Sequence, residues 1–200
     1  MSAHVHTDNE GGKIGMWLFL FTEMMLFGGL FITYSALRSL YPADFQEAGS
    51  HLNPVFGIAN TFVLLTSSLS MALCITALQK RDHKKSRLFL AITILLGCVF
   101  LANKYIEWIH EIHMGIYPSG PGLAGKPFGE ILFYGLYFSM TGLHGLHVII
   151  GIILLSVMLI LLERRAIDHE HHLILENSGL YWHLIDVVWI FLMPLFYLAA

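Results

Sequence analysis

The sequence predicts an all-α integral membrane protein: a bundle of five transmembrane helices with its N-terminus in the cytoplasm and its C-terminus outside. Three observations support this prediction. Of the 200 residues, 56% are hydrophobic and only 12% are charged, which leaves too few charged residues to cover a soluble domain of this size. Five apolar segments are each long enough to cross the hydrocarbon core of a bilayer as a helix. Lysine and arginine residues concentrate in alternate connections between these segments.

A polar leader over residues 1–13 precedes the first predicted helix. The leader holds a single lysine, and the apolar run after it is too long for a signal-peptide core, so we interpret this run as a retained helix. The connections between segments are short, which predicts one domain over residues 1–200. The predicted helices lie near residues 14–37, 54–78, 88–112, 130–162 and 178–199.

The basic residues predict the orientation in the membrane. With five crossings, the N-terminus and the second and fourth loops share one side, and the opposite side holds only Arg38 and Lys126. An excess of lysine and arginine marks the cytoplasmic side of membrane proteins. The basic residues on the side predicted to be cytoplasmic are Lys13, Lys80, Arg81, Lys84, Lys85, Arg87, Arg164 and Arg165.

Ionisable side chains lie inside the apolar segments, where each costs roughly 2.5–3.5 kcal/mol on insertion scales. The first segment holds Glu23, with only Thr22 as a polar neighbour. A lone acid at this depth either finds a partner on another helix or stays protonated, and its role can be functional or structural. By depth, the nearest partners are Asp186 and His183, joined by His147 if the helices tilt.

Spacing along a helix predicts other contacts, because residues three or four positions apart share a face. Lys104 can pair with Glu107, and His183 with Asp186. We interpret the buried histidines as packing and hydrogen-bonding groups rather than catalytic ones. The candidate site residues are the buried carboxylates Glu23, Glu107 and Asp186 and the buried histidines His144, His147 and His183.

The same residues do not predict a metal site. Glu107 and His110 form one Glu-x-x-His pair, which is half of the pattern of di-iron bundles, and the second half is missing. At about 1.5 Å of rise per residue, the candidate ligands lie at depths too scattered for one compact ligand set. Cys74 and Cys98 form no C-x-x-C motif, and we interpret both as buried small hydrophobic residues.

A polar run, Asp168–His172, connects the fourth and fifth segments on the side predicted to be cytoplasmic. Histidine titrates near neutral pH, so we interpret this run as a solvated surface that collects protons. A high density of potential ligands does not make a metal site without convergent geometry. The predicted proton-collecting residues are His169, Glu170, His171 and His172.

Two motifs carry a resemblance to a known family. They are GLHGLHVIIG, from Gly142 to Gly151, and YWHLIDVVWIFL, from Tyr181 to Leu192, and they resemble subunit III of the haem-copper respiratory oxidases. Neither motif follows from hydrophobicity alone. Further matches are FTEMMLFGGLF around Glu23, NPVFGIANTFVLLTSSLSM from Asn53 to Met71 and YIEW around Glu107. The matching motifs fall in the family's order and touch all five predicted helices.

The resemblance implies a non-catalytic subunit that binds no haem or copper of its own. Family members dock on subunit I, which holds the haems and copper, and they support its stability and proton uptake. The implied partners are subunits I and II, a small subunit IV and bound phospholipid, with no nucleic acid. Glu23 matches the family's buried membrane acid and Glu107 a second carboxylate, while the other candidate residues recur in its motifs. The implied location is the bacterial plasma membrane.

The sequence also departs from parts of the family pattern. Many members have seven helices, and this sequence lacks the first two, so the lipid cleft they form is absent or completed by another subunit. Lys104 is an unusual charge beside Glu107, so the family role of that acid is not carried over to this sequence.

The resemblance favours a proton-pumping cytochrome c oxidase that reduces oxygen to water. The alternatives are a quinol oxidase subunit III and an accessory protein of nitric oxide reductase. A proton-coupled transporter is less favoured, because no inverted repeat or pair of broken helices is present. A membrane metalloenzyme is disfavoured by the scattered depths.

Overall fold

The computed structural model describes residues 2–167 and 173–198, with side chains described from residue 10 onward. Within these ranges the chain is helical, without strands, and five helices are long and apolar enough to cross a membrane. This confirms the predicted all-α bundle of five spans. The elements are α1 (Ser2–Leu40), α2 (Pro42–Ser50), α3 (Pro54–Gln79), α4 (His83–His113), the 3-10 turn η1 (Pro121–Leu123), α5 (Phe128–Glu163) and α6 (Leu173–Tyr197).

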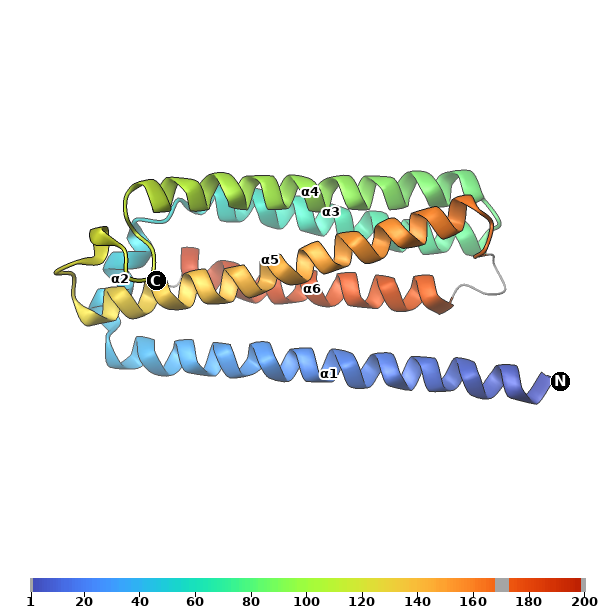
Figure 1. The fold of residues 1–200 in the computed structure, drawn as a ribbon, viewed down its shortest axis with the longest axis horizontal. Helices are drawn as coiled ribbons and strands as arrows, with labels where there is room; N and C mark the ends of the chain where they lie inside the picture. The colour runs from blue at the N-terminus through green and yellow to red at the C-terminus, as the bar shows by residue number, and fades with distance from the viewer. Residues whose placement is uncertain (1, 168–172, 199–200) are drawn as a thin grey trace.

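The long helices lie side by side, and the short helix α2 sits at the end where α1 turns back into α3 (Figure 1). Helices α3 and α4 pack against each other, and α6 contacts α3, α5 and α1. In its most apolar stretch α6 is 56% buried, whereas α1 is only 11% buried. The core therefore lies around α6, and α1 borders one side of the bundle with most of its surface open to lipid or to another subunit.

Two glycines allow Trp182 of α6 to fill the centre of this core. A Cβ atom at Gly97 of α4 would lie 2.7 Å from the Trp182 ring, and one at Gly151 of α5 would lie 2.9 Å from it. The ring is fully buried, and its Nε1 donates a hydrogen bond of 3.0 Å to Ser67 Oγ on α3. Trp182 thus joins three neighbouring helices, and the small residues make that close approach feasible.

We expect Gly97→Ala to destabilise the bundle by about 1–3 kcal/mol, the usual effect of overpacking a filled core. The Trp182 ring cannot move away easily, because Ser67 and Gly151 hold it on other sides. Thermal unfolding of the purified chain in detergent measures the effect. Gly135→Ala is the matched control, since nothing lies within 4 Å of a Cβ there. Equal midpoints for the two variants would contradict this packing.

The helix ends at the α3–α4 connection combine a cap with backbone strain. Asp82 Oδ1 accepts a hydrogen bond of 3.1 Å from the Lys85 backbone N–H, which caps α4. Arg81, just before it, has a φ of 62°, and Arg165, after α5, has a φ of 56°. Both lie in the left-handed region, which residues with a Cβ atom adopt at a cost in free energy. At the other end of the bundle the equivalent position after α4 is Gly115.

The Lys85 ammonium, 2.9 Å from Asp82 Oδ2, donates to that carboxylate and holds its pKa below the ordinary value. A lowered folded-state pKa stabilises the fold above the unfolded pKa, and this stabilisation disappears as pH falls through the folded one. We therefore expect Asp82→Ala to lower the unfolding midpoint at pH 7, and the gap from the parent protein to narrow below about pH 4, where only the cap contribution remains. Asp82→Asn, which keeps an oxygen acceptor for the cap, should lower the unfolding midpoint less than Asp82→Ala does. A gap independent of pH would contradict the ionic contribution.

The structure extends and corrects the sequence predictions in three places. The first helix begins within the predicted leader, because the backbone stays helical from Ser2 to Leu40. The short helix α2, with Pro42 at its first turn, was not predicted. The interpretation of both cysteines as buried is wrong for Cys98, which lies on an exposed face of α4, and holds for Cys74, whose Sγ lies 3.4 Å from Ser86 Oγ.

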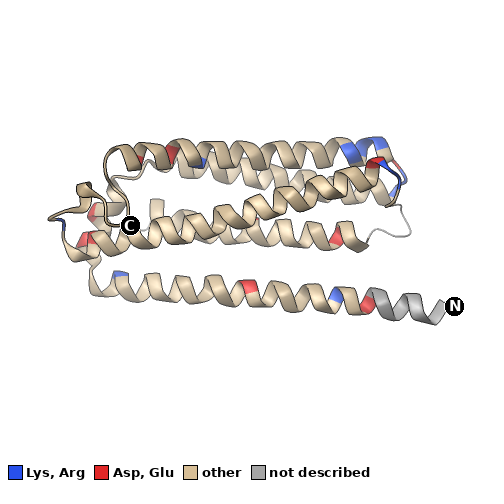
Figure 2. Cartoon of the chain, viewed as in Figure 1, with Lys and Arg blue, Asp and Glu red and all other residues tan. Residues whose placement is uncertain are grey.

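Charged side chains gather toward the ends of the bundle. Figure 2 shows lysine and arginine concentrated around the α3–α4 connection and the end of α5, with few charges along the middle of the helices. The predicted asymmetry of basic residues therefore corresponds to one physical end of the molecule.

Candidate functional site

The lone acid of α1 has a partner on α5. Glu23 Oε2 lies 2.9 Å from His147 Nε2, and both side chains are mostly buried. Of the three partners expected from depth, the structure selects His147 rather than Asp186 or His183. Tyr181 of α6 donates to the His147 carbonyl at 3.3 Å, so α6 is tied to the same turn of α5.

Hydrogen bonding fixes the number of protons in the Glu23–His147 contact. His147 Nδ1 lies 2.7 Å from the Leu143 carbonyl oxygen. A carbonyl can only accept, so Nδ1 carries a hydrogen. Nε2 then either accepts from a protonated Glu23 or, in an imidazolium, donates to the carboxylate. Either way one proton lies between the two groups, and the pair has no net charge.

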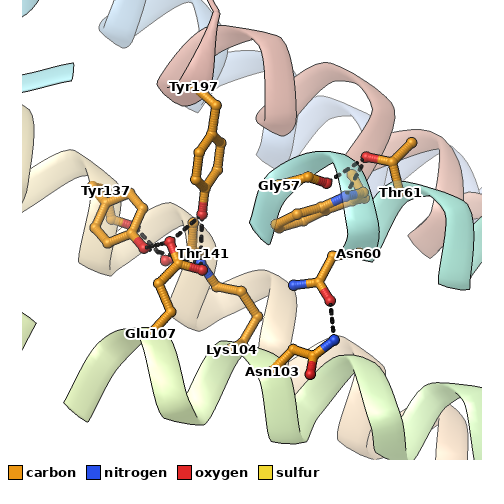
Figure 3. Close-up of polar contacts among 10 residues, drawn as sticks. Gly57, Asn60, Thr61, Asn103, Lys104, Glu107, Tyr137, Thr141 and Tyr197 are labelled. Atoms are coloured by element: carbon orange, nitrogen blue, oxygen red, sulfur yellow. Dashed lines mark hydrogen bonds and ion pairs between the residues drawn. The ribbon is translucent and has the colours of Figure 1, made fainter. Parts of the chain in front are cut away.

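A second polar cluster connects α4, α5 and α6 deep in the bundle, and Figure 3 shows its side chains pointing toward one another. Lys104 Nζ donates to Glu107 Oε2 at 3.1 Å and to the hydroxyl oxygens of Tyr137 and Tyr197, each at 3.0 Å. Both tyrosine hydroxyls donate to Glu107 Oε1, Tyr137 at 2.6 Å. The predicted Lys104–Glu107 pair is thus confirmed as a contact.

The Lys104 cluster, meaning Lys104, Glu107, Tyr137 and Tyr197, satisfies its own hydrogen bonds. An ammonium has three N–H donors, and Lys104 has three acceptors within hydrogen-bonding distance. Glu107 in turn receives one bond on Oε2 and two on Oε1. Lys104 and Glu107 are 7% and 6% exposed, so this mutual satisfaction is what makes their burial tolerable. The Glu107–His110 pair allowed by spacing is absent from the hydrogen bonds of the described residues.

The remaining candidates lie in the core without forming one site. His183 Nδ1 lies 2.6 Å from Ser68 Oγ of α3, so the expected His183–Asp186 pair is replaced by a contact with another helix. Asp186 is buried, and Ser68 is also its polar neighbour, but neither carboxylate oxygen makes a hydrogen bond within the described part of the chain. His144 packs between the rings of Phe100 and Trp189.

Two grooves flank α1. One of about 450 Å³ is lined by residues of α1 and α6 that are apolar apart from His183, including Met24, Phe27 and Phe191. The other, about 440 Å³, runs between α1, α5 and α6 and includes Glu23 and His147. The acid–imidazole pair therefore faces a groove with otherwise largely apolar walls.

Several polar contacts have no counterpart in the sequence predictions. Asn103 of α4 donates to Asn60 of α3 at 2.9 Å (Figure 3). Trp189 Nε1 of α6 donates to Thr61 at 3.1 Å. Tyr137 and Tyr197 were missed as well. Their hydroxyl groups were the only available signal, and pairing them with Glu107 needs knowledge of which helix faces which.

The predicted proton-collecting residues lie outside the described residues: His169, Glu170, His171 and His172. Among the side chains that the structure describes, those of residues 10–167 and 173–198, no three histidine, cysteine, aspartate or glutamate side chains are arranged to hold a metal ion. The described geometry provides two polar clusters, the Glu23–His147 pair and the Lys104 cluster. In each, the hydrogens of the ionisable groups are shared within the cluster, and the hydrogen bonds connect neighbouring helices.

Comparison with known proteins places this arrangement in a family. The family model described as cytochrome c oxidase subunit III matches residues 1–200. The chain belongs to the cytochrome c oxidase subunit III family. This confirms the resemblance seen in the motifs, and subunit III membership implies a place in a multi-subunit oxidase complex of the membrane.

Subunit III relatives are named for two different complexes. Cytochrome c oxidase subunit 3 of Bacillus sp. (strain PS3) is 33% identical over 193 residues, covering 96% of this chain and 88% of the relative. Probable quinol oxidase subunit 3 of Staphylococcus saprophyticus is 32% identical over 199 residues, covering 96% and 92%. The Staphylococcus aureus (strain USA300) protein of that name is 31% identical over 197 residues, covering 96% and 91%.

Proposed function

We propose that this chain is the non-catalytic subunit III of a proton-pumping terminal oxidase that takes electrons from cytochrome c and reduces oxygen to water. The match of the subunit III family model over residues 1–200 carries the proposal. Haem and copper belong to subunit I, against which this chain packs, with subunit II and a small subunit IV completing the complex. The chain itself supplies no redox centre.

Its physical role is to stabilise subunit I in the membrane and to sustain proton uptake. The Glu23–His147 pair and the Lys104 cluster support the first part, because both satisfy their ionisable groups inside the chain and connect helices rather than expose charge. The second part depends on the loop residues His169 to His172 as a proton-collecting surface. Neutral variants of that loop should slow turnover at high pH, where free protons are scarce.

The grooves beside α1 suit phospholipid acyl chains. Their volumes, about 450 and 440 Å³, and their largely apolar walls support this assignment. In the proposed setting, the bacterial plasma membrane, the end rich in lysine and arginine is cytoplasmic and α2 is outside. Cysteine labelling from each side, at single cysteines placed after α3 and in α2, tests the orientation.

Purification of the intact complex tests the electron donor. A co-purifying subunit with a two-copper domain, and oxygen consumption with reduced cytochrome c, support the proposal. The quinol oxidase relatives favour a second candidate. A partner without copper and turnover only with a quinol would assign the chain to that complex. Recovery of the chain without any oxygen-reducing partner would contradict both.

A further inference from the structure

Glu111 of α4 is a buried acid that the contacts described so far leave unused. It is 4% exposed, and its Oε2 has no hydrogen-bond partner in the described part of the chain. It lies one turn beyond Glu107 on the same face of α4, toward the end of the bundle that carries α2. A carboxylate in this position would be expensive without a donor.

The Lys104 cluster cannot supply that donor. All three N–H groups of Lys104 are directed at Glu107, Tyr137 and Tyr197. Both tyrosine hydroxyls donate to Glu107. The charges of Lys104 and Glu107 cancel, and the hydrogen bonds of the Lys104 cluster are satisfied within it. The cluster therefore offers Glu111 neither a free donor nor a net positive charge.

A pocket connects this acid to the surface at the α2 end. It has a volume of about 250 Å³, and its polar lining comprises His51, Asn53, Glu107, His110 and Glu111. A polar cavity of this size has room for several water molecules. His51 and His110 are exposed, whereas the two glutamates are buried, so the pocket leads from solvent to the acids.

The charged and titratable groups around Glu111 come from every neighbouring element. Helix α4 contributes Lys104, Glu107 and His110, and the turn after α2 contributes His51. His51 also lies 3.6 Å from Glu47 of α2. Tyr134 of α5 and Tyr197 of α6 complete the surroundings. Of the groups that can carry positive charge here, Lys104 is already bonded to Glu107, Tyr137 and Tyr197. The other two, His51 and His110, both face water.

We propose that Glu111 is a proton-binding site that fills and empties through this pocket from the aqueous phase at the α2 end. On filling, a carboxylate oxygen takes a proton from pocket water, and on emptying it returns the proton to that water. The Lys104 cluster closes the inner end, so the site is a dead end rather than a path through the bundle. The proposal depends on neither the electron donor nor the loop over residues 168–172.

Infrared difference spectroscopy of the purified complex tests the proposal. We expect a protonated-carboxyl C=O band that shifts in D₂O, loses intensity as bulk pH is raised and is wholly lost in Glu111→Gln. Glu163→Gln is the matched control and should leave the band intact. Glu163 is an exposed acid at the last residue of α5, at the end of the bundle away from the pocket. If Glu111→Gln fails to assemble, Glu111→Asp should keep a titrating band at a shifted frequency.

Three results would overturn the proposal. The band could survive in Glu111→Gln, or fail to exchange in D₂O, which would mean that the pocket is sealed. Alternatively, the carboxylate bands could respond to added Na⁺ or Ca²⁺ at fixed pH, which would make the pocket an inorganic cation site. In none of these cases does the proposed role as an oxidase subunit fail, because that role is tested by the partners and the turnover of the complex.

Discussion

Replacing Lys104 by methionine is expected to destabilise the bundle by about 3–5 kcal/mol, the usual cost of removing one partner from a buried ion pair. The change leaves Glu107 buried with only the two tyrosine donors, and it leaves the tyrosine oxygens without the bonds that Lys104 donates. Helices α4, α5 and α6 are then joined at this point only by the bonds from Tyr137 and Tyr197 to Glu107. Thermal unfolding in detergent and the yield of assembled complex both measure the loss.

A double variant tests whether the loss of stability comes from leaving Glu107 unpaired or from removing the lysine side chain. In Lys104→Met combined with Glu107→Leu, the uncompensated acid is gone, and much of the stability should return. Lys85→Met is the matched control, because Lys85 forms an exposed pair with Asp82 and such pairs contribute little. A Lys104→Met variant as stable as Lys85→Met would show that the cluster does not anchor these helices.

The contact between α1 and α5 should depend on hydrogen bonding more than on charge. We expect Glu23→Ala to cost about 1–3 kcal/mol, because it leaves His147 Nε2 without its partner in a mostly buried place. Glu23→Gln should cost much less, since an amide N–H can donate to Nε2 as a protonated acid does. Limited proteolysis around α1 and thermal unfolding measure both.

Since α1 is the least buried span, its detachment can precede global unfolding. Thr33→Ala is a suitable control, because Thr33 Oγ1 bonds to the Gly29 carbonyl within its own helix, α1. If Glu23→Gln proved as damaging as Glu23→Ala, the pair would have to be a carboxylate with an imidazolium. If neither variant had an effect, the contact would be irrelevant to the position of α1.

The sequence was sufficient for the five spans, because segment length and apolar composition are local properties. It was also sufficient for the Lys104–Glu107 contact, since both residues lie on one face of one helix. It was insufficient for the partners of Glu23 and His183. Those contacts cross between helices, and spacing along one helix carries no information about the rotation or tilt of its neighbours.

The same limit explains which site residues were missed. Tyr137 and Tyr197 lie far from Glu107 in the sequence and meet it only after three helices pack. Trp182 reaches the centre of the core because Gly97 and Gly151 happen to face it, which a count of glycines does not predict. The motifs, by contrast, predicted the family, because a family can be recognised from its residue pattern without knowing which helices those residues bring together.

The two arginines in left-handed conformation have a consequence for how the chain enters the membrane. At Arg81 and Arg165 a glycine would relieve roughly 1–2 kcal/mol of conformational cost each. It would also remove a positive charge from the connection after α3 or after α5, and lysine and arginine in short connections favour the cytoplasmic side. In the proposed orientation, with the basic end cytoplasmic, the finished fold keeps this small cost at two positions whose charge favours retention on that side during insertion.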